Sequence, residues 1–375
     1  MNKALHLLIV TAAITTSALA TNGTQLIATT AKARAMGGVG VATYMGAGAS
    51  NNNPALYAKE NSKAVSAGLT LFSPSVTYQD IGDQDTSNYG SSIMPDIGYA
   101  QKINDDMAIG IGFNSVAGSG VDYSASGKSA ASGVNTELKI AQISIPFSYN
   151  FSNLGVKGLA LGIAPVIQYS ALSTNFSNES SMDFGVNLGM TYDLDNITFG
   201  FIYKTAISSD YGNAMKDLQG NNTSLSNPST LGLGLDYSMS DATTIAFDYK
   251  YLAYGSASGY SDYGWASQSV FALGAEHKMD TLALRIGFNY GSSIIDGAST
   301  NETIATYIAF PALTAAHFTI GGGYDLKEYG IIDAAFVYGM SFSDTYTYED
   351  ANGLPILVEA TNNQSSLTVD YTYAF

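Results

Sequence analysis

This sequence of 375 residues predicts an all-β protein: a 14-stranded antiparallel transmembrane β-barrel with an N-terminal plug (hatch) inside its lumen. Three observations carry the prediction. Apolar residues alternate with small or polar ones through most of the chain, and short connections alternate with long ones. Beyond the N-terminus, no stretch is continuously apolar over the roughly 20 residues that a membrane-spanning helix needs.

The first 20 residues are typical of a cleaved secretory signal peptide. Lys3 supplies a positive charge, residues 5–16 form a short apolar run, and Ala18-Leu19-Ala20 is a small-x-small cleavage site. The apolar run is too short to anchor the chain across a bilayer. We therefore expect residues 1–20 to be a signal peptide and the mature chain to begin at Thr21.

The alternation defines the barrel, which we place at residues 64–375. In residues 65–71, for example, Val, Ala and Leu alternate with Ser, Gly and Thr, as expected when one face of a strand meets lipid and the other the lumen. An even strand number is what a single-chain bacterial barrel requires. The predicted strands are 65–71, 93–103, 107–113, 143–151, 159–169, 182–192, 197–203, 231–237, 245–251, 271–277, 282–290, 316–324, 332–342 and 367–375.

The connections between these strands alternate in length without an exception. Outer-membrane barrels have short periplasmic turns and long extracellular loops, so the pattern predicts orientation as well as fold. The short turns are 104–105, 152–156, 193–196, 240–241, 279–280 and 327–330. The long links are 80–91, 116–135, 172–181, 206–229, 255–266, 291–313 and 344–363.

Composition excludes several classes of function. A formal charge of -16 with 15 Lys and Arg disfavours nucleic-acid binding, which needs clustered basic residues. The absence of Cys removes disulfide and thiolate chemistry. Outside the signal peptide only His277 and His317 remain, on different strands, so we expect no metal centre. No cofactor motif and no Ser/His/Asp nucleophile motif occurs, and we expect no enzyme.

Residues 21–63 differ from the rest because they are rich in Gly and Asn and lack sustained alternation. They are too polar to form a core of their own, and a lumen enclosed by fourteen strands needs an occupant if the channel is to be selective. We therefore place them inside the barrel as the plug. Asn53-Pro54-Ala55 is predicted to be a structural turn, because the proline biases Asn53 to extended geometry.

Three N-terminal motifs then suggest a family. Thr21-Asn22-Gly23-Thr24-Gln25-Leu26-Ile27, Ala33-Arg34-Ala35-Met36-Gly37-Gly38 and Asn53-Pro54-Ala55 together resemble the hatch of the FadL/TodX family. The resemblance extends to later strands such as residues 231–237, 282–288 and 317–324. It implies an outer-membrane channel that takes up hydrophobic compounds, most of all long-chain fatty acids, by capture at the extracellular loops, binding in the lumen and lateral release.

Alternation places several charged residues on the lumen side, among them Lys204, Lys250 and Arg285. One interpretation is an ion-paired channel wall. The other is that one of these cations neutralises a fatty-acid carboxylate. For lateral release we expect an interrupted strand at Gly110, Gly112 and Gly118, because glycines weaken and kink a strand.

Two other functions stay open at this stage. A structural or adhesive barrel would act through its loops, and a channel of the same fold could carry neutral aromatic hydrocarbons. The plug disfavours an adhesin and a plain open porin. The expected partners are hydrophobic small molecules, outer-membrane lipid and the barrel-assembly machinery, for which the C-terminal Tyr371-Thr372-Tyr373-Ala374-Phe375 resembles a recognition strand.

Overall fold

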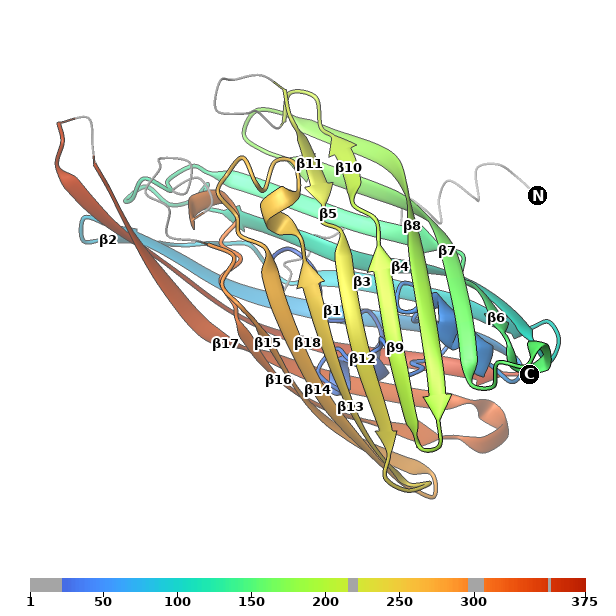
Figure 1. Ribbon diagram of the computed structural model, residues 1–375. Helices are drawn as coiled ribbons and strands as arrows, with labels where there is room; N and C mark the ends of the chain where they lie inside the picture. Colours follow the sequence, from blue (N-terminus) through green and yellow to red (C-terminus); the bar gives the residue numbers. More distant parts are fainter. Residues whose placement is uncertain (1–21, 215–221, 296–306, 350–351) are drawn as a thin grey trace, which may run out of the picture.

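The chain forms one closed antiparallel barrel of fourteen wall strands (Figure 1). The computed structural model describes residues 22–214, 222–295, 307–349 and 352–375, and the expected signal peptide lies outside them. No described helix is long and apolar enough to cross a membrane.

The wall strands follow one another around the barrel in chain order, and β18 pairs with β1 to close it. β5 and β6 together make one wall strand, because both pair with β4 on one side and with β7 on the other. The strands are β1 (Lys63–Asp80), β3 (Ser92–Lys102), β4 (Met107–Asp122), β5 (Asn135–Ser144), β6 (Phe147–Asn150), β7 (Leu159–Ser173), β8 (Asn178–Leu194), β9 (Ile197–Lys204), β12 (Thr230–Ser238), β13 (Thr243–Leu252), β14 (Gln268–Met279), β15 (Leu282–Gly291), β16 (Ala316–Asp325), β17 (Ile331–Glu349) and β18 (Pro355–Ala374).

The connections sort by length between the two ends of the barrel only in part. We call the end with the uniformly short connections the turn end and the opposite end, which has the longest ones, the loop end. At the loop end β8 begins at Asn178 soon after β7 ends at Ser173, and β18 begins at Pro355 soon after β17 ends at Glu349, so these two connections are short as well. The loop end carries β2 (Asp83–Thr86), which pairs with β1, and a separate hairpin of β10 (Ile207–Asp210) and β11 (Ser224–Asn227). Three further 3-10 turns are η2 (Ser152–Leu154), η3 (Tyr254–Ser256) and η4 (Lys327–Tyr329).

The strands are longer at the loop end than the alternation predicted. β4 continues to Asp122, β7 and β8 run to Ser173 and from Asn178, and β17 and β18 run on to Glu349 and back from Pro355. The predicted links 116–135, 172–181 and 344–363 are therefore partly wrong. The sequence conceals these extensions because their outward positions are no longer regularly apolar; on β18, for example, they include Glu359, Thr361 and Asn363. Polar residues end an alternation pattern but not a hydrogen-bonded ladder.

The outward face of the wall is apolar, which suits a surface that meets lipid. Leu69, Ile286 and Ile320 are 57%, 62% and 59% exposed on three different strands. Inward positions are buried. Many are polar, among them Thr368 and Asn289, whereas Phe72, Leu138 and Leu172 belong to a large apolar cluster. Another part of the chain must therefore fill the lumen and shield these inward side chains from solvent.

The filling is the N-terminal segment, residues 22–62, which contains the short helix α2 (Ala31–Ala35) and the 3-10 helix η1 (Pro54–Lys59) (Figure 1). A five-residue helix is unstable alone, so its ends must be held from outside. Thr30 caps α2, and Asp370 of β18 accepts the backbone N–H of Ala31 at 2.6 Å. Asp248 of β13 accepts the N–H groups at positions 40 and 41 at 2.8 and 3.0 Å. This placement is the one expected for a plug.

Candidate functional site

The loop end contains an apolar cavity of about 320 Å³, which we call the outer cavity. A cavity of about 150 Å³ is enough to bind benzene, and ligand pockets generally begin near 300 Å³. No acidic or basic side chain is among its lining residues, so it offers nothing to a charged group. They are Val134, Thr136, Leu138, Thr174, Asn175, Phe176, Ala214, Leu225, Gly259, Tyr260, Tyr263, Trp265, Ala309 and Phe310.

Three aromatic side chains connect the outer cavity to the N-terminal segment. Tyr254, Tyr260 and Trp265, the aromatic trio, have ring centroids 4.6 to 5.2 Å apart. The Tyr254 hydroxyl accepts the N–H of Thr24 at 2.9 Å and donates to the carbonyl of Asn22 at 3.0 Å. The Tyr260 and Thr24 hydroxyls lie 2.9 Å apart. Burial raises the pKa of Tyr254 to about 12, so its hydroxyl keeps its proton near neutral pH.

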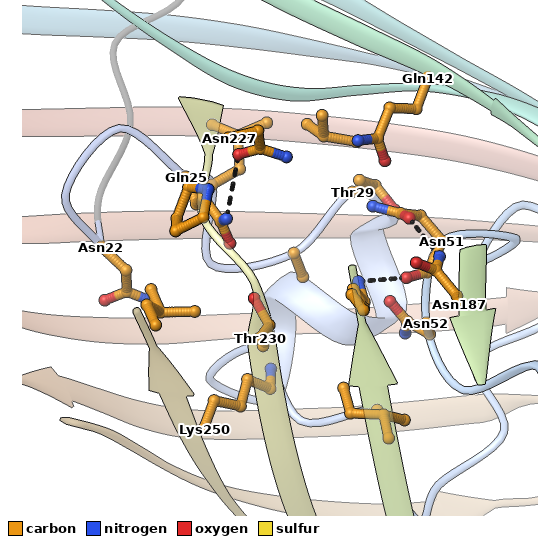
Figure 2. Close-up of a pocket in the computed structure, with 18 of the residues that line it drawn as sticks. Asn22, Gln25, Thr29, Asn51, Asn52, Gln142, Asn187, Asn227, Thr230 and Lys250 are labelled. Carbon is orange, nitrogen blue, oxygen red and sulfur yellow. Dashed lines mark hydrogen bonds between the residues drawn. The ribbon is translucent and has the colours of Figure 1, made fainter. Parts of the chain in front are cut away.

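A second, smaller cavity lies between the N-terminal segment and the wall (Figure 2). This inner cavity has a volume of about 80 Å³, room for two or three water molecules at roughly 30 Å³ each. Its lining is rich in amides, some of which bond to one another: Gln25 donates to Asn227 at 3.2 Å and Asn187 to Asn51 at 3.0 Å. The polar lining comprises Asn22, Gln25, Thr29, Asn51, Asn52, Gln142, Asn187, Lys204, Thr205, Asn227, Thr230 and Lys250.

Lys204 and Lys250, two of the predicted lumen cations, both line the inner cavity. Each also holds the N-terminal segment, because Lys204 donates to the carbonyl of Asn51 and Lys250 to that of Gly38 at 2.6 Å. The Lys250 ammonium lies 3.7 Å from the Asp248 carboxylate. Within the described ranges no carboxylate lies within salt-bridge distance of the Lys204 side chain, which lines the cavity.

Arg285, the third predicted cation, lies apart from the two lysines and does not line the cavity. Its Nε and Nη1 atoms are each 2.6 Å from a carboxylate oxygen, of Glu276 and Asp333 respectively. All three side chains are nearly buried. Glu276 also lies 3.5 Å from Lys278. This geometry is that of an ion-paired wall and leaves Arg285 no free face for a ligand.

The wall is incomplete between β3 and β4. Their ladder ends at the pair Asp96–Asn114. Between this pair and the loop end, β4 no longer pairs with β3. The N-terminal segment takes the vacated place: Leu26 donates to the carbonyl of Val116 at 3.0 Å, and Gly118 donates to that of Thr24 at 2.9 Å. We call this interruption the wall window. It is closed by main-chain bonds to a segment that belongs to the lumen.

The glycines predicted to mark the lateral opening divide between two roles. Gly118 lies in the wall window, next to a β-bulge between Ser115 and Ala117. Gly110 and Gly112 lie in the intact ladder below it. There a Cβ atom would collide with the side chains of Tyr57 and Ser50, so these two glycines admit the N-terminal segment to the wall and do not break the strand.

Asn53-Pro54-Ala55 forms the start of η1, in agreement with the predicted turn. The Asn53 side chain accepts the N–H of Ala55 at 3.0 Å and donates to the carbonyls of Val41 at 2.6 Å and Met190 at 3.1 Å. It therefore ties two parts of the N-terminal segment to β8. Sequence reasoning missed the aromatic trio, although the four aromatic residues within 254–265 were a visible signal.

Comparison with known proteins agrees with this architecture. The family model described as outer membrane protein transport protein (OMPP1/FadL/TodX) matches residues 9–260. The solved toluene transporter TodX of Pseudomonas putida is 19% identical, with a TM-score of 0.70 over 93% of this chain and 99% of that one. The toluene transporter TbuX of Ralstonia pickettii is 16% identical, with a TM-score of 0.66 over 93% and 98%. A comparison with curated protein sequences gives no match.

Proposed function

Because this chain belongs to the OMPP1/FadL/TodX family of outer membrane transport proteins, we propose that it takes up amphiphilic hydrophobic compounds, with long-chain fatty acids as the first candidates. The compound is captured in the outer cavity, presents its head group to the inner cavity and leaves sideways through the wall window. Residues 22–62 act as the plug that separates these stations. No step in this proposal is catalytic.

The pairing of two unlike cavities carries the proposal. The outer cavity is uncharged and suits a hydrocarbon body, whereas the inner cavity holds Lys204 without a carboxylate partner in the described part of the chain. A buried cation attracts an anionic head group strongly because little water screens it. A structural or adhesive barrel would need neither cavity.

The test is the substitution Lys204→Met, which keeps most of the packing of the stem and removes the charge. A hydrogen bond to a charged group contributes about 1.5–3 kcal/mol, so oleate should bind roughly tenfold to hundredfold more weakly. Binding of toluene should barely change. Lys278→Met is the matched control, because it removes the same charge from the rim, where that side chain is 58% exposed.

A second candidate function follows if the control and Lys204→Met bind oleate equally well. The substrate is then a neutral aromatic hydrocarbon, which the uncharged outer cavity accommodates and which the solved relatives' descriptions as toluene transporters and monoaromatic hydrocarbon channels support. If neither oleate nor toluene binds to the wild-type protein, transport of hydrophobic compounds is itself refuted.

A further inference from the structure

The outward face of the wall has an apolar groove of about 470 Å³ that belongs to neither cavity. It crosses β1, β3 and β4, which lie side by side in the barrel (Figure 1). Its lining includes Ala67, Ile97, Ile111 and Phe113, and Ile97 and Ile111 are 54% and 47% exposed. The groove therefore opens to the lipid side of the barrel.

A single small residue creates the groove. Strand register places Tyr371, Ala67, Ile97 and Phe113 in one row across four neighbouring strands. Ala67 is the short side chain in that row, and the larger residues on both sides become the walls of a depression. An added large side chain at position 67 would fill the groove from the lipid side without entering the lumen, because Ala67 points outward.

The groove begins where the wall window begins. Ile97 and Phe113 directly adjoin Asp96 and Asn114, the last pair of the β3–β4 ladder. One strand residue spans about 3.3 Å, so the window's edge at Pro95 lies within roughly 7 Å of the groove along the strand. A molecule that leaves the lumen through the window meets this groove before it meets open lipid.

The chemistry of the groove selects the part of the molecule that it can hold. None of its lining residues is acidic or basic, and the hydroxyl of Tyr99 already donates to the side chain of Gln101 at 2.7 Å. Hydrocarbon surface is thus the complementary ligand, and a carboxylate has no partner there.

We propose that this groove is an exit subsite, which receives the hydrocarbon part of the transported compound as it passes from the wall window into the membrane. The inference rests on the proposed function and adds a third station to it. The head group trails at the window while the apolar part exchanges contacts with the plug for contacts with the groove. A membrane-lipid chain is the competing occupant.

The first test blocks the groove with Ala67→Trp and uses Ala275→Trp as a matched control on β14, where Ala275 is also an outward alanine. Both variants are reconstituted in liposomes, and the rate of oleate entry is measured beside the affinity for oleate in detergent. Ala67→Trp should slow entry several-fold with unchanged affinity, and Ala275→Trp should match the wild type. Wild-type entry by Ala67→Trp would overturn the exit subsite.

A second variant tests occupancy even if Ala67→Trp fails to fold. The chain has no cysteine, so Ile97→Cys accepts a single fluorescent label in the groove, and Ile286→Cys, 62% exposed on β15, serves as control. Oleate should change the Ile97 signal saturably and leave the Ile286 signal unaffected. Equal responses at both positions would mean that only bulk lipid fills the groove. Failure of the wild-type protein to admit oleate would instead refute fatty acids as the compounds transported in the proposed function.

Discussion

Replacing Tyr254 by Phe removes one oxygen from the contact between the aromatic trio and the N-terminal segment, and leaves the ring in place. That oxygen bonds the N–H of Thr24 at 2.9 Å and the carbonyl of Asn22 at 3.0 Å. Each buried polar group that loses its partner costs about 1–3 kcal/mol. The Asn22 carbonyl keeps the N–H of Gln25 at 3.1 Å, so only the Thr24 N–H is left without its acceptor, and we expect the closed position of residues 22–26 to lose about 1–3 kcal/mol relative to an open one.

Hydrogen exchange measures this loss directly, because the amides of Leu26 and Gly118 form the bonds across the wall window. Exchange by local opening accelerates with the loss of stability, and about 2 kcal/mol corresponds to roughly thirtyfold. Tyr249→Phe is the matched control, since its hydroxyl lies 3.2 Å from that of Ser269 and does not contact residues 22–26.

Unchanged exchange at Leu26 and Gly118 in Tyr254→Phe would refute the reasoning that the trio holds the window shut. Faster exchange along β15 and β16 as well would show that the whole barrel had been destabilised. Only acceleration confined to the window supports the trio as a clamp.

Three further predictions concern the plug, the orientation and the ion-paired wall. Deleting residues 24–60 should leave a heat-modifiable barrel whose conductance in planar bilayers is raised, whereas unchanged conductance would mean that these residues do not occupy the pore. On intact cells, an impermeant thiol reagent should label Phe176→Cys, since Phe176 is 86% exposed at the loop end, and should not label Asn196→Cys; the opposite result would invert the orientation. Arg285→Met leaves two nearly buried carboxylates without their counter-ion and should lower the free energy of unfolding by about 3–5 kcal/mol in urea titrations. The affinity for oleate should not change; weaker oleate binding would mean that Arg285 does contact the ligand.

The barrel was predictable because its signals are local. Alternation with a period of two identifies a strand wherever its two faces meet different environments, and turn residues separate the strands regardless of what pairs with what. The same locality explains the errors at the loop end. There the outward face of β17 leaves the apolar layer, so residues 343–349 stay in the ladder without an apolar signature.

The site was less predictable because it depends on which strands fail to pair. The end of the β3–β4 ladder at Asp96 and the bond from Leu26 to Val116 join residues that are far apart in the sequence. Alternation placed Lys204 and Arg285 on the same face correctly, yet it could not tell that Arg285 had two carboxylate neighbours. The pairing of strands decides which charged side chains become neighbours, and a local sequence pattern carries no information about that pairing.

The bond between Ala31 and Asp370 has a consequence for how the molecule is assembled. Asp370 belongs to β18, the strand that closes the barrel by pairing with β1 along the register from Ala64–Ala374 to Asp80–Val358. A helix that is bonded to the closing strand cannot make this contact before that strand is in place. The final seating of α2 is therefore coupled to closure of the barrel, because Asp370 lies in the closing ladder and also holds the N-terminal end of the helix.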